Sequence, residues 1–121
     1  MASILIIDDD DALRHTMRKI LERAGHRVRE AADGARGLTL FRQEASDVVV
    51  TDLIMPEKEG IETIIELREG YPWVKILAVS GGGSVDPDGP LTDARYLGAD
   101  ATLPKPFSVE DLQDAVARLL A

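Results

Sequence analysis

Three acidic residues follow two short apolar runs of the sequence. Asp8 and Asp9 come directly after the run Ile4–Ile7, and Asp52 follows closely after Val48–Val50. If the two runs form neighbouring parallel strands, their carboxyl ends meet at one edge of a sheet, where three carboxylates then share a small pocket. Two like unit charges about 4 Å apart repel by roughly 4 kcal/mol at an effective dielectric near 20. Such a cluster must therefore take up a proton or bind a cation.

The donor atoms of this pocket predict the kind of cation. Only oxygen ligands are offered, with no histidine nearby and no cysteine in the chain, which favours a hard ion. Magnesium is preferred over calcium, because the protein supplies few ligands and water can complete an octahedron. Ser80 and Lys105 are expected at two further strand ends on the far side of the pocket. A divalent ion among acids beside a lysine indicates phosphoryl transfer, with Asp52 as the nucleophile that forms an aspartyl-phosphate.

Short apolar runs alternate with longer amphipathic ones along the chain, which predicts alternating strands and helices. We expect a single domain over residues 1–121, an α/β fold with a doubly wound five-stranded parallel sheet in the order 2-1-3-4-5. Asp10 or Asp11 is expected to cap the first helix, and Ser108 with Asp111 a capping box for the last. The expected strands are 4–7, 28–31 (at an edge), 48–50, 76–79 and 101–103, and the expected helices are 12–24, 34–43, 60–69, 91–97 and one opening at Ser108.

Two helices carry clear apolar stripes that predict their buried faces. The first is expected to bury Leu13, Met17, Ile20, Leu21 and Ala24, and the last to bury Val109, Leu112, Val116, Leu119 and Leu120. The histidines His15 and His26 have no partner acid at a useful spacing, so surface roles are expected for both.

The overall composition excludes several function classes. The formal charge of −8 argues against direct nucleic-acid binding, because phosphate backbones need clustered Lys and Arg. No apolar run approaches the roughly 20 residues of a membrane span, and the start of the chain does not look like a secretory signal. The absence of cysteine fits the cytoplasm, which is the expected location.

Taken together, several motifs resemble the receiver domains of two-component response regulators along essentially the whole chain. The order, spacing and expected strand ends of these motifs agree with one another, which makes the resemblance specific. The motifs are Ile6-Ile7-Asp8-Asp9-Asp10, Asp52-Leu53-Ile54-Met55-Pro56 followed by Gly60, Val79-Ser80-Gly81, Gly98-Ala99-Asp100-Ala101 and Lys105-Pro106-Phe107. The resemblance implies a flavodoxin-like fold similar to the chemotaxis receiver.

The resemblance also implies a role for each site residue. Asp52 would be the phosphoacceptor and would bind Mg²⁺ together with Asp9 and the backbone carbonyl of Ile54, while Asp8 would act mainly through water. Ser80 and Lys105 would contact the phosphoryl group, and the Lys105–Pro106 bond would be cis. The only enzymatic activity expected is Mg²⁺-dependent self-phosphorylation and self-dephosphorylation at Asp52.

The partners implied by the resemblance are proteins. A histidine kinase or a histidine phosphotransfer protein would donate the phosphoryl group, and a downstream protein would bind at roughly Leu91–Leu120. A monomer or weak homodimer is expected. The sequence leaves open whether the chain is a stand-alone receiver or part of a larger regulator.

Two departures from the receiver pattern concern signalling and phosphoryl lifetime. Thr102 stands at the switch position where an aromatic residue is usual, so the signal is expected to leave by another route. Ile54 and Gly82 occupy the positions that flank the phosphoryl group, and neither side chain can orient an attacking water. The lifetime is therefore expected to depend mainly on water access.

Two other functions are compatible with parts of the pattern. A small phosphohydrolase of the haloacid-dehalogenase type would use Asp8 as its nucleophile, and Asp8 and Asp10 match its Asp-x-Asp spacing, but Asp52 would then be unexplained. An interaction module that works without phosphorylation would keep the fold but would not need the acids, the serine and the lysine.

Overall fold

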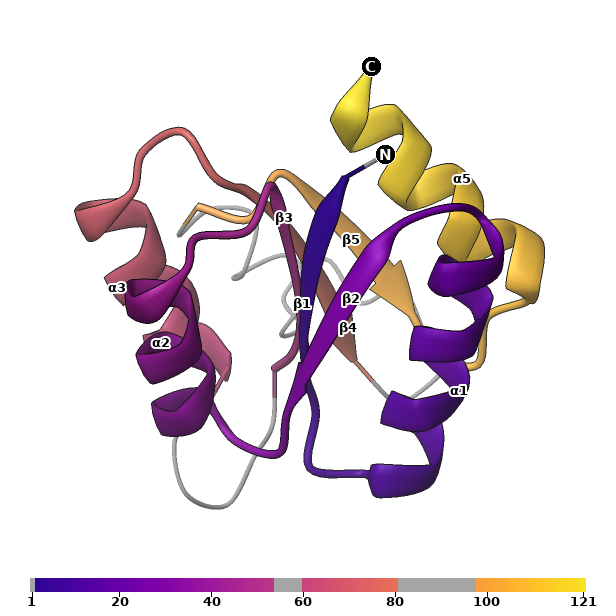
Figure 1. The fold of residues 1–121 in the computed structure, drawn as a ribbon, viewed down its shortest axis with the longest axis horizontal. Coiled ribbons are helices and arrows are strands. Elements are labelled where there is room, and N and C mark those ends of the chain that lie inside the picture. Colours follow the sequence, from indigo (N-terminus) through magenta and orange to yellow (C-terminus); the bar gives the residue numbers. More distant parts are fainter. Residues whose placement is uncertain (1, 54–59, 81–97) are drawn as a thin grey trace.

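The computed structural model describes residues 2–53, 60–80 and 98–121, which form a parallel sheet with helices on both faces (Figure 1). The strands pair in the order β2-β1-β3-β4-β5, and every pair is parallel. The predicted α/β fold and strand order are therefore confirmed. The elements are β1 Ser3–Ile7, α1 Asp11–Arg23, β2 Arg27–Ala31, α2 Gly34–Gln43, β3 Val48–Asp52, α3 Gly60–Gly70, β4 Lys75–Ser80, β5 Ala101–Pro104 and α5 Val109–Leu120.

Two apolar layers hold the sheet between the helices. Successive residues of a strand point to opposite faces, so the continuous apolar run of β1 serves both layers. Ile4 and Ile6 pack with residues of α1 and α5 on one face, whereas Leu5 and Ile7 pack with residues of α2 and α3 on the other. Figure 1 shows the two helix pairs on opposite sides of the sheet.

Side-chain caps fix where the helices begin. Asp10 caps α1 by accepting a hydrogen bond from the backbone N–H of Leu13, and Asp33 caps α2 in the same way. Ser108 and Asp111 form the predicted capping box of α5. These caps satisfy backbone donors that have no partner inside a helix.

The apolar stripe of α5 is buried over a shorter length than predicted. Leu112 and Val116 are fully buried and Leu119 is partly buried, but Val109 is 51% exposed and Leu120 is 39% exposed. The expectation that Val109 and Leu120 face the core was wrong, because the helix buries only the face that carries Leu112, Val116 and, in part, Leu119. The predicted helix 91–97 lies outside the described residues.

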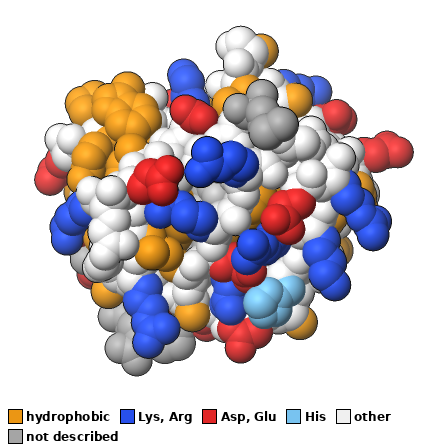
Figure 2. All heavy atoms as spheres, in the orientation of Figure 1, with side chains coloured by type: hydrophobic (Ala, Val, Ile, Leu, Met, Phe, Trp, Pro, Cys, Tyr) orange, Lys and Arg blue, Asp and Glu red, His pale blue; other side chains and the backbone are white. Residues whose placement is uncertain are grey.

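The surface seen in Figure 2 carries acidic and basic side chains side by side. This face therefore presents no continuous basic area of the kind that binds nucleic-acid backbones. Within the described ranges, none of the helices has the length and apolar character needed to cross a bilayer.

Candidate functional site

The carboxyl ends of four neighbouring strands bring the predicted site residues to one edge of the sheet. Asp8 follows β1, Asp52 is the last residue of β3 and Ser80 the last of β4, and Lys105 follows β5. The strand register aligns these ends, since Ile7 is opposite Thr51, Asp52 opposite Val79 and Ser80 opposite Pro104. This edge lies beside the point where strand order reverses, which is where ligands bind in open α/β sheets.

Three carboxylates converge at this edge. Asp8, Asp9 and Asp52 each offer one oxygen, and these oxygens lie within 4.8 Å of one another. Asp8 is fully buried and Asp52 is 7% exposed, whereas Asp9 is exposed. Asp8 Oδ1 accepts a hydrogen bond of 2.9 Å from the backbone N–H of Asp10, and Asp52 Oδ1 accepts one of 2.9 Å from Leu53.

Lys105 provides the positive charge of the cluster. Its Nζ lies 3.4 Å from Asp8 Oδ2 and 3.5 Å from Asp52 Oδ2. The backbone N–H of Lys105 donates a 2.7 Å hydrogen bond to the carbonyl of Ser80, which ties the two strand ends together. The Lys105–Pro106 peptide bond is cis, and Ser80 is buried.

Burial makes the ionised acids costly. Burial raises the pKa of Asp8, against the opposing effects of the Asp10 hydrogen bond and of Lys105. Burial also raises the pKa of Asp52, the nearby Asp8 charge adds to this rise, and Lys105 opposes it. One lysine thus compensates the acids only in part. A hard divalent cation would complete the compensation, and the all-oxygen donor set fits Mg²⁺.

Not every predicted site residue belongs to the described part of the chain. Ile54 and Gly82 lie outside it, as does part of the predicted partner surface Leu91–Leu120. Thr102 lies in β5, opposite Ala78, and is partly exposed. Asp10, the second acid of the Asp-x-Asp pair, uses a side-chain oxygen to cap α1.

Arg14 is an unpredicted neighbour of the site. Its Nη1 donates a 2.7 Å hydrogen bond to the backbone carbonyl of Asp8, and the residue is 8% exposed. A signal was available in the sequence, because Arg14 shares a helical face with Met17 and Leu21, the fully buried apolar residues of α1. An arginine in an inward-facing stripe needs a buried acceptor.

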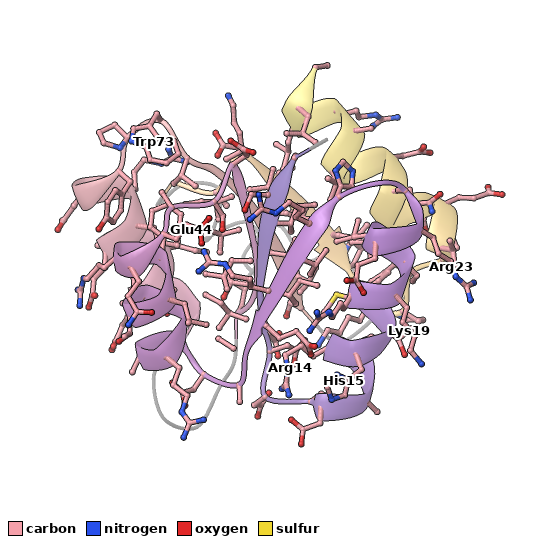
Figure 3. The ribbon with its side chains drawn as sticks, viewed as in Figure 1. Arg14, His15, Lys19, Arg23, Glu44 and Trp73 are labelled. Carbon is pink, nitrogen blue, oxygen red and sulfur yellow. The ribbon has the colours of Figure 1, made fainter. Side chains whose placement is uncertain are left out.

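The expectation that His15 has no acid partner was wrong. Its Nδ1 lies 2.9 Å from Glu30, which belongs to the adjacent strand β2. Figure 3 shows Arg14 and His15 together on the first turns of α1, beside that strand. The pair forms between segments that are distant in sequence, so local spacing could not reveal it.

The fold and the acidic edge define a class: an α/β protein whose parallel sheet carries a cluster of three carboxylates at its switch point. The family model for the response regulator receiver domain matches residues 4–117. The chain belongs to this family and is a receiver domain of the two-component response regulator type.

Curated relatives agree with this assignment. The response regulator MprA from Mycolicibacterium vanbaalenii is 38% identical over 117 residues, which are 97% of this chain and 49% of MprA. The sensor kinase CckA from Brucella abortus is 36% identical over 124 residues, which cover 98% of this chain and 12% of CckA. The chain thus spans half or less of the length of these relatives.

Solved structures share both the fold and the size of the domain. A response regulator receiver domain protein from Clostridium thermocellum has a TM-score of 0.90 and 30% identity, covering 99% of this chain and 94% of that one. The chemotaxis response regulator CheY4 of Vibrio cholerae has a TM-score of 0.89 and 30% identity, covering 98% of both chains.

Proposed function

We propose that the domain accepts a phosphoryl group on Asp52 and holds Mg²⁺ with Asp8, Asp9, Asp52 and the backbone carbonyl of Ile54. The observation that carries this proposal is the convergence of three carboxylate oxygens within 4.8 Å, with Lys105 Nζ 3.5 Å from Asp52. Asp52 is the best nucleophile of the three acids, because it ends strand β3 and its carboxylate faces both the other acids and Lys105.

The transfer exchanges one bond to phosphorus for another. A carboxylate oxygen of Asp52 attacks the phosphorus of a phosphohistidine whose other ring nitrogen carries a proton, the P–N bond breaks with its electron pair going to the ring nitrogen, and the ring leaves as neutral imidazole. When bound, Mg²⁺ neutralises charge on the transferring oxygens. Lys105 contacts a phosphoryl oxygen as a compact cation, and Ser80 donates a hydrogen bond to another.

The phosphoryl donor is a histidine kinase or a histidine phosphotransfer protein. Phosphorylation switches a surface for a downstream protein at roughly Leu91–Leu120, and Thr102 replaces the usual aromatic switch residue there. Self-dephosphorylation depends mainly on water access, because Ile54 and Gly82 offer no side chain that orients water. The domain acts in the cytoplasm as a monomer or weak homodimer.

The test is the intact mass of the protein after incubation with acetyl phosphate and Mg²⁺. The wild type is expected to gain the mass of one phosphoryl group, and Asp52→Asn to gain none. The control is Asp114→Asn, which removes an equal charge from the exposed face of α5 and should react like the wild type.

The two other functions predict different results. A phosphohydrolase that uses Asp8 would turn over a small phosphate ester steadily, would lose this activity in Asp8→Asn and would keep it in Asp52→Asn. An interaction module would show no added mass in any variant and no response to beryllofluoride. Either result contradicts the proposal.

A further inference from the structure

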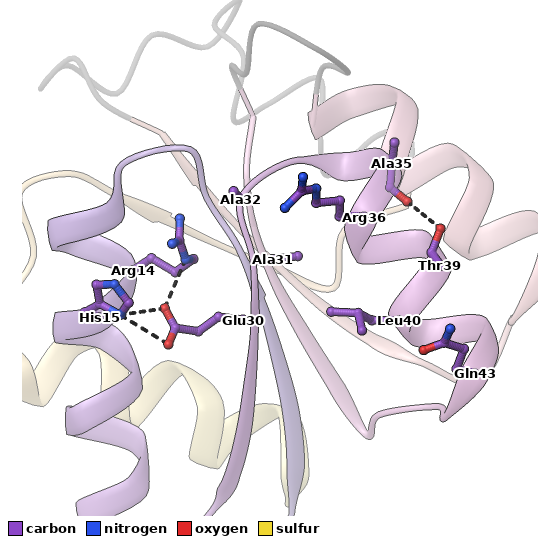
Figure 4. A pocket seen from close by; sticks show the side chains of 10 residues that line it. All are labelled: Arg14, His15, Glu30, Ala31, Ala32, Ala35, Arg36, Thr39, Leu40 and Gln43. Carbon is purple, nitrogen blue, oxygen red and sulfur yellow. Dashed lines mark hydrogen bonds and ion pairs between the residues drawn. The ribbon is translucent and has the colours of Figure 1, made fainter.

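Arg14 joins three segments of the fold through one guanidinium group. Its Nη1 lies 2.7 Å from the Asp8 carbonyl oxygen and 2.7 Å from Asp11 Oδ1, and its Nε lies 3.0 Å from Glu30 Oε1. These acceptors belong to the end of β1, the start of α1 and the edge strand β2. Figure 4 shows Arg14 and His15 reaching Glu30 from α1, on one side of a groove along β2.

The carbonyl that Arg14 binds belongs to the peptide between Asp8 and Asp9. The N–H of Asp8 donates a 3.1 Å hydrogen bond to the carbonyl of Ala31, so the backbone is held on both sides of this residue. Among the described residues, no hydrogen bond or ion pair holds the carboxylate of Asp9. Arg14 therefore holds the peptide from which the Asp9 side chain extends, and so limits where the Asp9 carboxylate can lie.

Glu30 in turn holds Arg14 in place. Its carboxylate also accepts a 3.0 Å hydrogen bond from Arg18 and lies 2.9 Å from His15 Nδ1. Burial acts to raise the pKa of Glu30, but hydrogen bonds from Arg18 and Arg14 outweigh it and keep the pKa below its ordinary value. Glu30 thus stays ionised and anchors the guanidinium.

We propose that Arg14, anchored by Glu30, is a positioning residue that orients Asp8 and Asp9 for divalent-cation binding. The inference rests on the proposed function, because it assigns Arg14 to the same acidic site. Residues that orient metal ligands from behind typically contribute ten- to hundredfold in metal affinity. Loss of the Arg14 guanidinium should weaken Mg²⁺ binding by about tenfold or more.

The direction of the change in Mg²⁺ affinity distinguishes a positioning role of Arg14 from a purely electrostatic one. A cation close to an acidic site repels Mg²⁺, so removing it should tighten Mg²⁺ binding if charge alone mattered. The positioning role predicts weaker binding instead. Lysine keeps the charge but lacks the planar guanidinium that reaches several acceptors. Arg14→Lys should therefore retain little of the wild-type Mg²⁺ affinity.

The experiment measures the Mg²⁺ dissociation constant by titration calorimetry, with circular dichroism as a check on folding. Arg14→Gln is compared with Arg18→Gln, a matched control that also loses a Glu30 contact but does not touch Asp8. We expect weaker binding in Arg14→Gln and unchanged binding in Arg18→Gln. Glu30→Gln should show a smaller loss, and the double variant Arg14→Gln/Glu30→Gln no more than Arg14→Gln alone, because Glu30 acts through Arg14.

Failure of this inference and failure of the proposed function give different results. If the wild type binds no Mg²⁺, the proposed function fails and the role of Arg14 falls with it. If the wild type binds Mg²⁺ and Arg14→Gln binds equally well or more tightly, only the role of Arg14 is overturned. Should Arg14→Gln not fold, unchanged affinity in both Arg14→Lys and Glu30→Gln would overturn it.

Discussion

The ammonium of Lys105, which follows β5, lies 3.5 Å from a carboxylate oxygen of Asp52 at the end of β3, so the contact reaches past the end of the intervening strand β4. The lysine is also 3.4 Å from Asp8, so it is shared between two acids whose pKa values are raised by burial. Without a divalent cation, this one charge opposes the repulsion within the cluster. Lys105 and a bound cation therefore compensate the same acids. The presence of either one should reduce the electrostatic stabilisation that the other provides.

Lys105→Gln is expected to destabilise the metal-free protein and to tighten Mg²⁺ binding. The metal-free protein should lose about 1 kcal/mol of unfolding free energy. Relief of about 1.4 kcal/mol of cation repulsion would tighten Mg²⁺ binding roughly tenfold. Urea denaturation and calorimetry check both effects. Lys75→Gln, at the opposite end of β4 and exposed, should change neither. Weaker Mg²⁺ binding in Lys105→Gln would show that the lysine organises the acids rather than competing for them.

Asp52→Asn is expected to stabilise the metal-free protein at neutral pH. The Asp52 carboxylate is buried beside the Asp8 charge, and both facts raise its pKa, so its ionised form destabilises the fold. The neutral amide removes this penalty and should add about 1 kcal/mol to the unfolding free energy. Saturating Mg²⁺ should stabilise the wild type more than the variant. The exposed Asp114→Asn serves as the comparison, and a variant no more stable than that one would contradict the argument.

The core of the site could be predicted from sequence because it depends on strand ends. Asp8 follows a continuous apolar run and Asp52 follows another, and a sheet in the order 2-1-3-4-5 makes those strands neighbours. The contact between Arg14 and Glu30 depends instead on the rotation of α1 relative to β2, which helix periodicity alone does not specify. Similarly, the stripe of α5 indicated which face is buried but not how far the burial extends, so Val109 was misplaced.

Gly60 is expected to tolerate no side chain without a cost in stability, because its backbone packs directly against the end of β3, which carries Asp52. A Cβ at Gly60 would lie 1.8 Å from the carbonyl oxygen of Asp52 and 2.5 Å from Leu53 Cα. Both contacts are with backbone, so Gly60→Ala must displace the end of β3, at a cost of about 2 kcal/mol. Phosphorylation by acetyl phosphate, followed as the increase in intact mass, should be slower in Gly60→Ala than in the wild type.

Gly70, in the last turn of α3, provides a matched control for this substitution. A Cβ there meets nothing within 4 Å, so Gly70→Ala should be neutral or slightly stabilising in the helix. Thermal unfolding of both variants measures the difference. Equal stability of the two alanine variants would show that the end of β3 yields without cost.

Glu30 should make the stability of the protein depend on pH in the acid range. Its pKa in the folded protein lies below 4.5, the ordinary value, because Arg18 and Arg14 outweigh the effect of burial. A lowered pKa means that the carboxylate stabilises the fold above pH 4.5, and that this stability is lost as the pH falls through the folded-state pKa. Glu30→Gln should therefore cost about 2 kcal/mol at neutral pH, and progressively less in acid.

The difference in unfolding free energy between wild type and Glu30→Gln, measured by urea denaturation from neutral pH to below 4.5, isolates this one group from the other acids that titrate there. Glu22 shares Arg18 with Glu30 but is exposed, so Glu22→Gln should cost at most about 0.5 kcal/mol and serves as the control. A difference for Glu30→Gln that stays constant with pH would mean that shape and hydrogen bonding, rather than the charge, hold Arg14 in place. If the amide instead anchors the guanidinium as well as the carboxylate does, Glu30→Gln should cost little stability at any pH, and its Mg²⁺ affinity should match that of the wild type.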